Sequence, residues 1–308
     1  MTGLAKRRLG RTELRVSPLG LGGAHLGRTP DGFDDALAVR TVLEALRSGI
    51  NLIDTAPMYG DSQRRIGLAL REWFAGGGQR EEVVLSTKTG RDPQGGRHYS
   101  ADDTRRSVKR SLELLGVPYL DIVLVHDPDD PAPVFDAQGT LPALEQMREE
   151  GLLRAIGVGV RSQEFHRLCI ESGCFDVCLT FCDYNLLDQS AATGVLEPAA
   201  THDVGVLNGA AVMLGLLGGG DPRGTTSHLA TEERVRRATE LWQWAEARGI
   251  TLPALNLQFC LREPRIASTL VGVADPQELA IDLRALEEPI GDEIWAELAQ
   301  RFGIRVGR

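Results

Sequence analysis

The sequence predicts a (β/α)8 (TIM) barrel of the α/β class, with an N-terminal β-hairpin and a C-terminal helical extension. Eight short apolar runs alternate with helical segments over 308 residues. Continuous Val/Ile/Leu runs are typical of parallel strands that are buried on both faces. Eight such units in this length, without a linker or a division into halves, favour a closed barrel over an open doubly wound sheet. We therefore expect one domain over residues 1–308.

The elements follow one another regularly along the chain. Residues 8–18 are expected to form the hairpin. The expected strands span residues 16–22, 50–55, 83–88, 121–126, 153–160, 177–182, 204–209 and 266–272. Helical apolar spacing marks residues 34–48, 62–73, 101–116, 139–150, 162–172, 188–202, 231–248, 253–262, 277–287 and 293–302. Asp102 or Asp103 is the expected N-cap of its helix, and residues 126–138 are the longest stretch without an expected element.

The bulk composition excludes several classes of protein. The net charge of −9 is spread thinly, which argues against nucleic acid or an anionic membrane as a partner. No apolar run is long enough for a transmembrane helix, and the first residues lack the apolar segment of an export signal. The five cysteines are an odd number in a large chain, so a disulfide framework is not expected. We expect a reduced, cytoplasmic protein that is a monomer or a weak homo-oligomer.

Polar side chains stand where three consecutive strands end. Asp54 ends the second strand, Lys88 the third and His126 the fourth, and Tyr59 follows Asp54 on a loop bounded by Pro and Gly. Consecutive strands of a barrel are neighbours, and their carboxyl ends form the catalytic face. These four residues are therefore expected to lie together.

The four residue types fit acid–base chemistry on an alcohol or a carbonyl group. A free tyrosine titrates near pH 10, and a neighbouring ammonium is expected to lower that pKa. Asp54 would keep Lys88 charged, and His126 would orient a substrate oxygen beside Tyr59. Each residue also has a purely structural interpretation. Asp54 could cap the following turn, Tyr59 could pack against apolar neighbours, and His126 could be a loop residue whose hydrogen bonds are made within the protein. Lys88 is harder to explain in that way, because only three of the 34 basic residues are lysines.

These residues resemble the aldo-keto reductase family. The matching segments are residues 51–62 (NLIDTAPMYGDS), 85–88 (LSTK) and 120–126 (LDIVLVH), with weaker similarity over nearly the whole chain. The resemblance implies a barrel that binds NAD or NADP without a Rossmann fold, with Tyr59, Asp54, Lys88 and His126 as its catalytic tetrad. Segments 125–130, 156–159, 208–211 and 215–217 are most similar to the aldose 1-dehydrogenase subgroup, which acts on L-fucose, L-galactose and D-threo-aldoses.

The resemblance also implies which residues contact the cofactor and the substrate. The expected substrate contacts are His25, Tyr59, His126 and Asp127. Independently of the resemblance, the loop after the seventh strand lies where barrels commonly bind phosphate, so Leu214, Leu216 and residues 221–223 are expected to form a flexible clamp over the pyrophosphate; a simple long loop is the alternative. The expected cofactor contacts are Gly22, Gly23, Asp54, Gly159, Arg161, Phe181, Asn208, Gly209, Ala210, Leu214, Leu216, Gly272, Ala274, Asp275 and Asp282.

The chain departs from the family pattern at three of these places. Gly159 and Val160 replace the Ser and Asn that hold the nicotinamide carboxamide in many members, so backbone groups, Arg161 or Ser162 must substitute. Phe181 replaces a glutamine. Residues 272–277 (GVADPQ) contain no base where NADP-preferring members bind the 2′-phosphate. Because Asp275 would repel a phosphate and could accept from a ribose hydroxyl, the sequence favours NAD over NADP.

Other patterns were weighed against a role in the site. No glycine-rich stretch completes G-x-G-x-x-G, and no P-loop is present. Cys174, Cys178 and Cys182 lack the tighter spacing of zinc and cluster motifs, so no metal is expected. The remaining histidines are expected in loops or on helix surfaces, at His98, His166, His202 and His228.

The leading functional hypothesis is therefore an NAD(P)-dependent aldose 1-dehydrogenase that oxidises a sugar at C1 to the lactone. A pyridoxal 4-dehydrogenase or a general aldehyde or ketone reductase of the same family is the alternative enzyme. A cofactor-binding regulatory subunit is the alternative without catalysis. Neither the sugar, the physiological direction nor the oligomeric state follows from the sequence.

Overall fold

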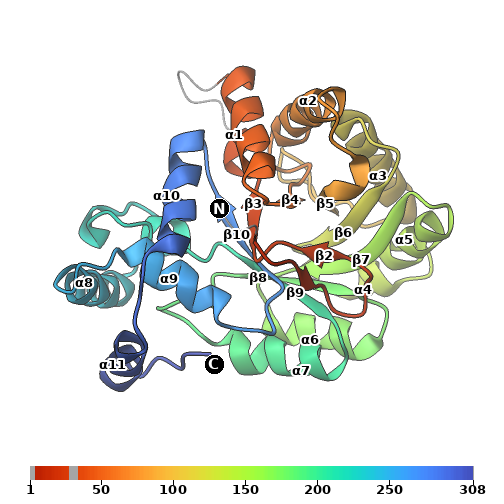
Figure 1. Cartoon of the computed structure of the whole chain (residues 1–308). Coiled ribbons are helices and arrows are strands. Elements are labelled where there is room, and N and C mark those ends of the chain that lie inside the picture. Colours follow the sequence, from red (N-terminus) through yellow and green to blue (C-terminus); the bar gives the residue numbers. More distant parts are fainter. Residues whose placement is uncertain (1–3, 28–33, 308) are drawn as a thin grey trace.

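A computed structural model describes residues 4–27 and 34–307, and its centre is a closed barrel of eight parallel strands (Figure 1). The order around the barrel is β10-β3-β4-β5-β6-β7-β8-β9, which confirms the predicted fold. The strands are β3 (Leu19–Gly22), β4 (Leu52–Asp54), β5 (Val84–Thr89), β6 (Leu120–His126), β7 (Leu153–Gly159), β8 (Val177–Phe181), β9 (Gly205–Gly209) and β10 (Ser268–Gly272).

Helices surround the barrel (Figure 1). They are α1 (Asp35–Arg47), α2 (Ser62–Ala75), α3 (Ala101–Leu115), α4 (Ala132–Phe135), α5 (Thr140–Glu149), α6 (Gln163–Ser172), α7 (Glu197–Thr201), α8 (Glu232–Glu246), α9 (Leu252–Leu261), α10 (Pro276–Glu287) and α11 (Asp292–Phe302). Five short helical turns of other types are His25–Gly27, Arg80–Glu82, Ala192–Leu196, Met213–Gly215 and Pro222–Gly224. No helix among the described residues is long and apolar enough to cross a membrane.

Four local expectations are wrong. The N-cap of α3 is Ser100, whose side chain accepts from the N–H of Asp103. Residues 126–138 contain the short helix α4, and the region 188–202 is a π-helical turn followed by α7 instead of one α-helix. His166 is completely buried on α6, where its Nε2–H donates to the carbonyl of Val160.

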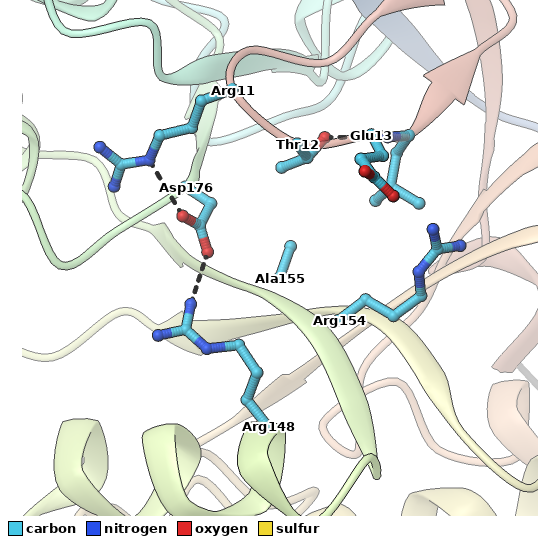
Figure 2. Close-up of a pocket in the computed structure, with 8 residues that line it drawn as sticks. Arg11, Thr12, Glu13, Arg148, Arg154, Ala155 and Asp176 are labelled. Atoms are coloured by element: carbon cyan, nitrogen blue, oxygen red, sulfur yellow. Dashed lines mark hydrogen bonds and ion pairs between the residues drawn. The ribbon is translucent and has the colours of Figure 1, made fainter.

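The predicted hairpin, β1 (Arg7–Arg8) with β2 (Arg15–Val16), covers the amino-terminal end of the barrel. Gly10 has a φ of +51°, and a Cβ there would lie 2.1 Å from the Gly205 nitrogen, so only glycine fits. A cavity of about 300 Å³ lies beside the hairpin, between Arg11, Arg148, Arg154 and Asp176 (Figure 2). Asp176 accepts from Arg11, from Arg148 and from the N–H of Ile156. This cavity is at the end opposite the predicted site and is explained by these structural ion pairs.

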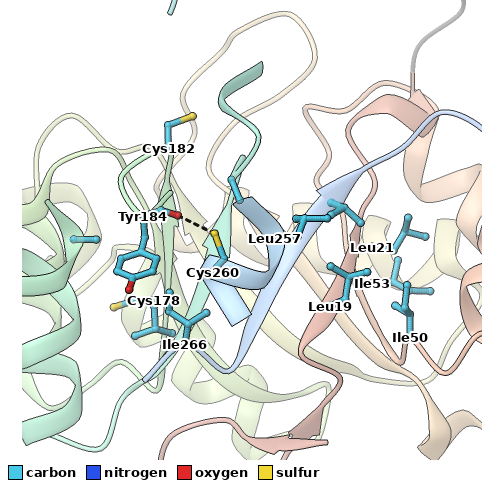
Figure 3. Packing of buried hydrophobic residues seen from close by; sticks show 14 of the residues in the cluster. Leu19, Leu21, Ile50, Ile53, Cys178, Cys182, Tyr184, Leu257, Cys260 and Ile266 are labelled. Carbon is cyan, nitrogen blue, oxygen red and sulfur yellow. Dashed lines mark hydrogen bonds between the residues drawn. The ribbon is translucent and has the colours of Figure 1, made fainter. Parts of the chain in front are cut away.

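The apolar core has two layers. The larger layer lies between strands and helices; Figure 3 shows part of it, including Leu21, Ile53 and Leu257. The smaller layer fills the barrel interior with Leu52, Leu124 and Leu207 and with side chains of the hairpin. Successive residues of a strand alternate between the two layers. A strand residue in the smaller layer therefore points into the barrel, and its neighbours in the strand point outward.

Candidate active site

The alternation brings the predicted catalytic residues to one place. Leu52 and Leu124 point into the barrel, so Asp54 and His126, each two residues further along its strand, point inward too. Val84 points inward on β5, and Lys88 lies four residues after it. These three positions form the last inward layer on β4, β5 and β6, at the carboxyl end of the strands.

Lys88 and Asp54 form a buried ion pair. Lys88 Nζ lies 2.5 Å from Asp54 Oδ2 and donates to the Thr55 carbonyl at 3.0 Å. The side chains of Lys88 and Asp54 are 1% and 4% exposed. Ser86 Oγ donates to Asp54 Oδ1 at 2.8 Å, so both carboxylate oxygens are bonded. Burial lowers the pKa of Lys88, but the Asp54 carboxylate outweighs it and the net pKa is raised. Lys88 is therefore a fixed cation.

Tyr59 lies above this pair. Lys88 Nζ is 4.9 Å from the centre of the Tyr59 ring, and the His126 ring meets it edge-on at 6.0 Å. Burial raises the pKa of the Tyr59 phenol above its usual value, and the opposing charge of Lys88 does not overcome this. Lys88 lowers the pKa of Tyr59 in the expected direction, but burial outweighs it and the net pKa of Tyr59 is raised. Tyr59 is a neutral phenol, which is the form that donates a proton.

His126 is a neutral imidazole at the same point. It is 8% exposed. Burial lowers its pKa to about 2, and the charge of Lys88 acts in the same direction. Its Nδ1 is buried and has no hydrogen-bond partner among the described residues. The Tyr99 hydroxyl donates to the His126 carbonyl at 2.7 Å and so fixes the end of β6. A neutral ring held in this way can orient a substrate oxygen.

The two other predicted substrate contacts flank this centre. His25 Nδ1 lies 2.9 Å from the Gly272 carbonyl; because a carbonyl only accepts, Nδ1 is the donor. Asp127 has a φ of +43° and donates its N–H to the Gly159 carbonyl. Burial raises the pKa of its carboxyl, although Arg161 opposes this shift.

The other half of the barrel mouth carries almost no side chains. The last inward positions on β3, β7, β9 and β10 are all glycines, namely Gly22, Gly159, Gly209 and Gly272. A Cβ on Gly209 would lie 2.7 Å from the Thr180 carbonyl, and one on Gly272 would lie 3.3 Å from His25. Glycines inside strands mark places where a ligand approaches the backbone closely. This bare half fits a flat nicotinamide ring beside the tetrad.

Three further cofactor candidates surround the bare half. Arg161 stacks on the Phe181 ring, with its guanidinium carbon 4.7 Å from the ring centre. Ser162 Oγ accepts from the Phe165 N–H as the N-cap of α6. The cap bond uses the Ser162 hydroxyl only as an acceptor, so both Arg161 and Ser162 keep donors that could serve the carboxamide. Gly23 is held by its N–H bond to the Asp54 carbonyl, and a Cβ there would meet Ser62.

The loop after β9 has an unusual backbone. Ala210, Met213 and Leu214 have φ values of +53°, +51° and +51°, which is rare for residues with side chains. Such strain clusters at functional sites. Leu214 is 38% exposed whereas Leu216 is fully buried. Leu214 is therefore placed to cover a ligand, and the Leu216 side chain anchors the loop.

Asn208 does not point into the site. Leu207 points into the barrel, so Asn208 points outward; it is fully buried and its Nδ2 donates to the Tyr184 carbonyl. The predicted cofactor contact of Asn208 would therefore have to be made by its backbone. Sequence could not show this, because both faces of a parallel strand are buried.

The loop after β10 is acidic. Asp275 caps α10 by accepting from the N–H groups of Gln277 and Glu278, and the Ala274 N–H donates to Glu278. Asp282 lies one helical turn further on, and burial raises the pKa of its carboxyl to about 7. The backbone donors that a 2′-phosphate would use are thus bonded to carboxylates, which fits a cofactor with a free ribose hydroxyl.

Other residues with a role in the geometry were not identified from the sequence. Ser86 orients Asp54, Tyr99 fixes the His126 carbonyl, and Arg91 lies near His126. Ser86 could have been found, since it lies two residues before Lys88 and so shares its face. Within the described ranges, no three His, Cys, Asp or Glu side chains gather as a metal site, and all five cysteines are free thiols.

Known proteins share both the sequence and this architecture. Residues 18–301 match the Aldo/keto reductase family. The chain belongs to this family. An L-galactose dehydrogenase from Arabidopsis thaliana is 32% identical over 295 residues, which is 94% of this chain and 90% of the relative. A D-threo-aldose 1-dehydrogenase from a Pseudomonas species is 30% identical over 321 residues, which is 93% of this chain and 94% of the relative.

A solved structure agrees with this assignment. The holo form of an aldo-keto reductase from Bacillus halodurans matches with a TM-score of 0.80 at 26% identity, over 96% of each chain. The present aldo-keto reductase is accordingly an NAD(P)-dependent oxidoreductase that acts on small molecules.

Proposed function

We propose that this enzyme oxidises an aldose of the L-fucose, L-galactose or D-threo-aldose type at C1 to the lactone, with NAD as the preferred cofactor. The observation that carries the proposal is the division of the barrel mouth: Asp54, Lys88 and His126 fill one half, and four glycines leave the other half open. The printed names of the two dehydrogenase relatives support the aldose.

In this proposal a bound NAD would supply the hydride acceptor for C1, and the bare half of the barrel mouth at Gly22, Gly159, Gly209 and Gly272 would hold its nicotinamide beside the tetrad. The neutral Tyr59 phenol donates its proton to the carbonyl oxygen during reduction. For oxidation Tyr59 must first release that proton to solvent, and the resulting phenolate then accepts the C1 hydroxyl proton. Lys88 stabilises the phenolate when Tyr59 has lost its proton, and Asp54 holds Lys88 in place. The neutral His126 orients the reacting oxygen without competing for the proton.

The choice of NAD rests on the acidic loop after β10. Asp275 and Glu278 accept the N–H groups at the beginning of α10, and residues 272–278 contain no Lys or Arg. A 2′-phosphate would meet like charge there, whereas a ribose hydroxyl could donate to a carboxylate.

The test is NADH and NADPH formation, followed by absorbance, with L-fucose, L-galactose, D-arabinose, D-xylose and pyridoxal. Strong turnover of one sugar with NAD is expected. Tyr59→Phe should lower kcat by about 10²- to 10⁴-fold, while Tyr119→Phe, a distant tyrosine stacked with Arg80, should leave it unchanged. Turnover of pyridoxal alone would contradict the aldose assignment, and full activity of Tyr59→Phe would contradict the role of Tyr59.

A further inference from the structure

Within the part of the chain that the structure describes, Arg91 is a cation without an ion-pair partner beside the catalytic centre. It follows Gly90, at the end of β5, and its Nε is buried without a hydrogen-bond partner among the described residues. No ion pair of Arg91 occurs in that part of the chain, whereas Arg97 pairs with Asp129 on the same side of the barrel. Leaving a buried donor without a partner is unfavourable, so a ligand that accepts from it would be favoured.

The loop that carries Arg91 is built to hold it in place. Arg91 and Arg97 form an antiparallel bridge, and the His98 N–H donates to the Gly90 carbonyl at 3.0 Å. Gly90 has a φ of +100°, and a Cβ there would lie 2.2 Å from the Tyr99 ring. Tyr99 in turn bonds to the His126 carbonyl. The backbone of Arg91 is thus tied to the catalytic strand β6.

The charges around His126 do not cancel. Lys88 is neutralised by Asp54. Arg91 and Arg161 both act on His126 and on Asp127. Among the described residues, neither arginine forms an ion pair with Asp127. The guanidinium charges beside His126 are therefore not held in ion pairs there.

Space for a substituent lies next to Arg91. A cavity of about 340 Å³ is lined by Arg91 and by Pro57, which lies two residues before Tyr59. Its two acidic lining residues are already engaged, since Asp92 accepts from His98 and Gly96 and Asp103 pairs with Arg106. Arg91 is the lining cation that has no such partner within the described residues.

We propose that Arg91 binds an anionic group of the substrate, a carboxylate or a phosphate, while the reacting carbonyl lies between Tyr59 and His126. A guanidinium offers both oxygens of such a group a paired hydrogen bond. The proposal rests on the proposed role of Tyr59 in carbonyl chemistry and adds that an aldose or aldehyde carrying negative charge is preferred over its neutral counterpart. The cofactor pyrophosphate is a poor candidate for Arg91, because β5 lies across the barrel from the strained loop after β9.

The test compares matched substrates in the reductive direction with NADH. Succinic semialdehyde against butanal reports on a carboxylate, and glyceraldehyde 3-phosphate against glyceraldehyde reports on a phosphate. In the wild type, kcat/KM should favour the charged member of one pair by about tenfold or more, a difference of about 1.4 kcal/mol. Arg91→Gln should remove this preference by raising the KM for the charged substrate. Arg91→Lys should restore part of the preference, because a lysine ammonium keeps the positive charge but lacks the paired donors of a guanidinium.

Two controls separate the possible outcomes. Arg97→Gln removes a paired cation from the same loop and should leave the preference unchanged, and the KM for NADH should be unchanged in every variant at position 91. The proposal would be overturned if the wild type showed equal kcat/KM within both pairs. It would also be overturned if the preference survived in Arg91→Gln, or if Arg161→Gln abolished it instead. If the wild type reduces none of the four aldehydes, the proposed carbonyl chemistry fails and this proposal fails with it; reduction of butanal without a preference overturns the anion site alone.

Discussion

Lys88 Nζ and Asp54 Oδ2 lie 2.5 Å apart at a depth where both side chains are almost inaccessible to solvent. Removing one member of such a pair leaves an isolated buried charge, which costs about 3–5 kcal/mol. We expect Asp54→Asn and Lys88→Met each to lower the free energy of unfolding by about that amount. The double variant should regain most of the loss and remain inactive. Urea unfolding measures the first effect and NADH formation the second; stability that falls additively in the double variant would show that the pair is not coupled.

Two buried histidines should make the protein sensitive to acid. Burial lowers the pKa of His126 to about 2 and that of His166 to about 4, below the value of about 6.5 in an unfolded chain. The unfolded chain therefore binds protons first, and stability is lost as pH falls from about 6.5 toward these pKa values. Each histidine should contribute about 1.4 kcal/mol per pH unit in that window. Unfolding in urea between pH 7.5 and 5 measures the slope, which should become smaller in His126→Gln and in His166→Gln.

Cofactor preference should depend on the charge of Asp275. Asn is as good an N-cap as Asp, so Asp275→Asn keeps the bonds to Gln277 and Glu278 and removes the charge. We expect the wild type to favour NAD and the variant to shift kcat/KM several-fold toward NADP. Asp292→Asn, in the first turn of α11, is the matched control and should not shift it. A wild type that prefers NADP by more than tenfold would refute the interpretation of this loop.

The cysteines should react very unequally. Burial raises the pKa of Cys169, Cys182 and Cys260 to about 12 and that of Cys178 well above its usual value. Cys174 is the partly exposed one. A thiol reagent should label about one site on the native protein, since reaction requires an accessible thiolate. Labelling should disappear in Cys174→Ser and extend to the other four sites in denaturant, with mass spectrometry as the readout. Rapid labelling of Cys178 in the native protein would contradict the buried strand.

Much of this architecture could be predicted because buried parallel strands are uninterrupted apolar runs. The run at 121–126 becomes β6 (Leu120–His126) and the run at 204–209 becomes β9 (Gly205–Gly209). The start of α3 was harder, because Ser100, Asp102 and Asp103 are all good caps and only the backbone shows which one lies outside the helix. The π-helical turn at Ala192–Leu196 has no residue pattern of its own.

The tetrad was predictable for a geometric reason, whereas its electrostatics were not. The ends of neighbouring strands share one face, so Asp54, Lys88 and His126 could be placed together from spacing alone. The pKa of Tyr59 depends on how much water its hydroxyl keeps, which spacing does not show. Arg91 escaped notice because an unpaired arginine is identified only after the partners of its neighbours are known.

Closure of the barrel joins the two ends of the chain. Leu19 on β3 pairs with Thr269 on β10, and Arg7 in the hairpin donates to the carbonyls of Leu261 and Ile266. During synthesis, β3 leaves the ribosome long before β10 has been made, so one edge of the growing sheet stays open until β10 has been translated. An open edge is a template for pairing with other chains. The open edge at β3 is therefore a surface that a chaperone could cover while the chain is being made. A premature stop before Ser268 would leave this edge open for good, because β10 would be missing.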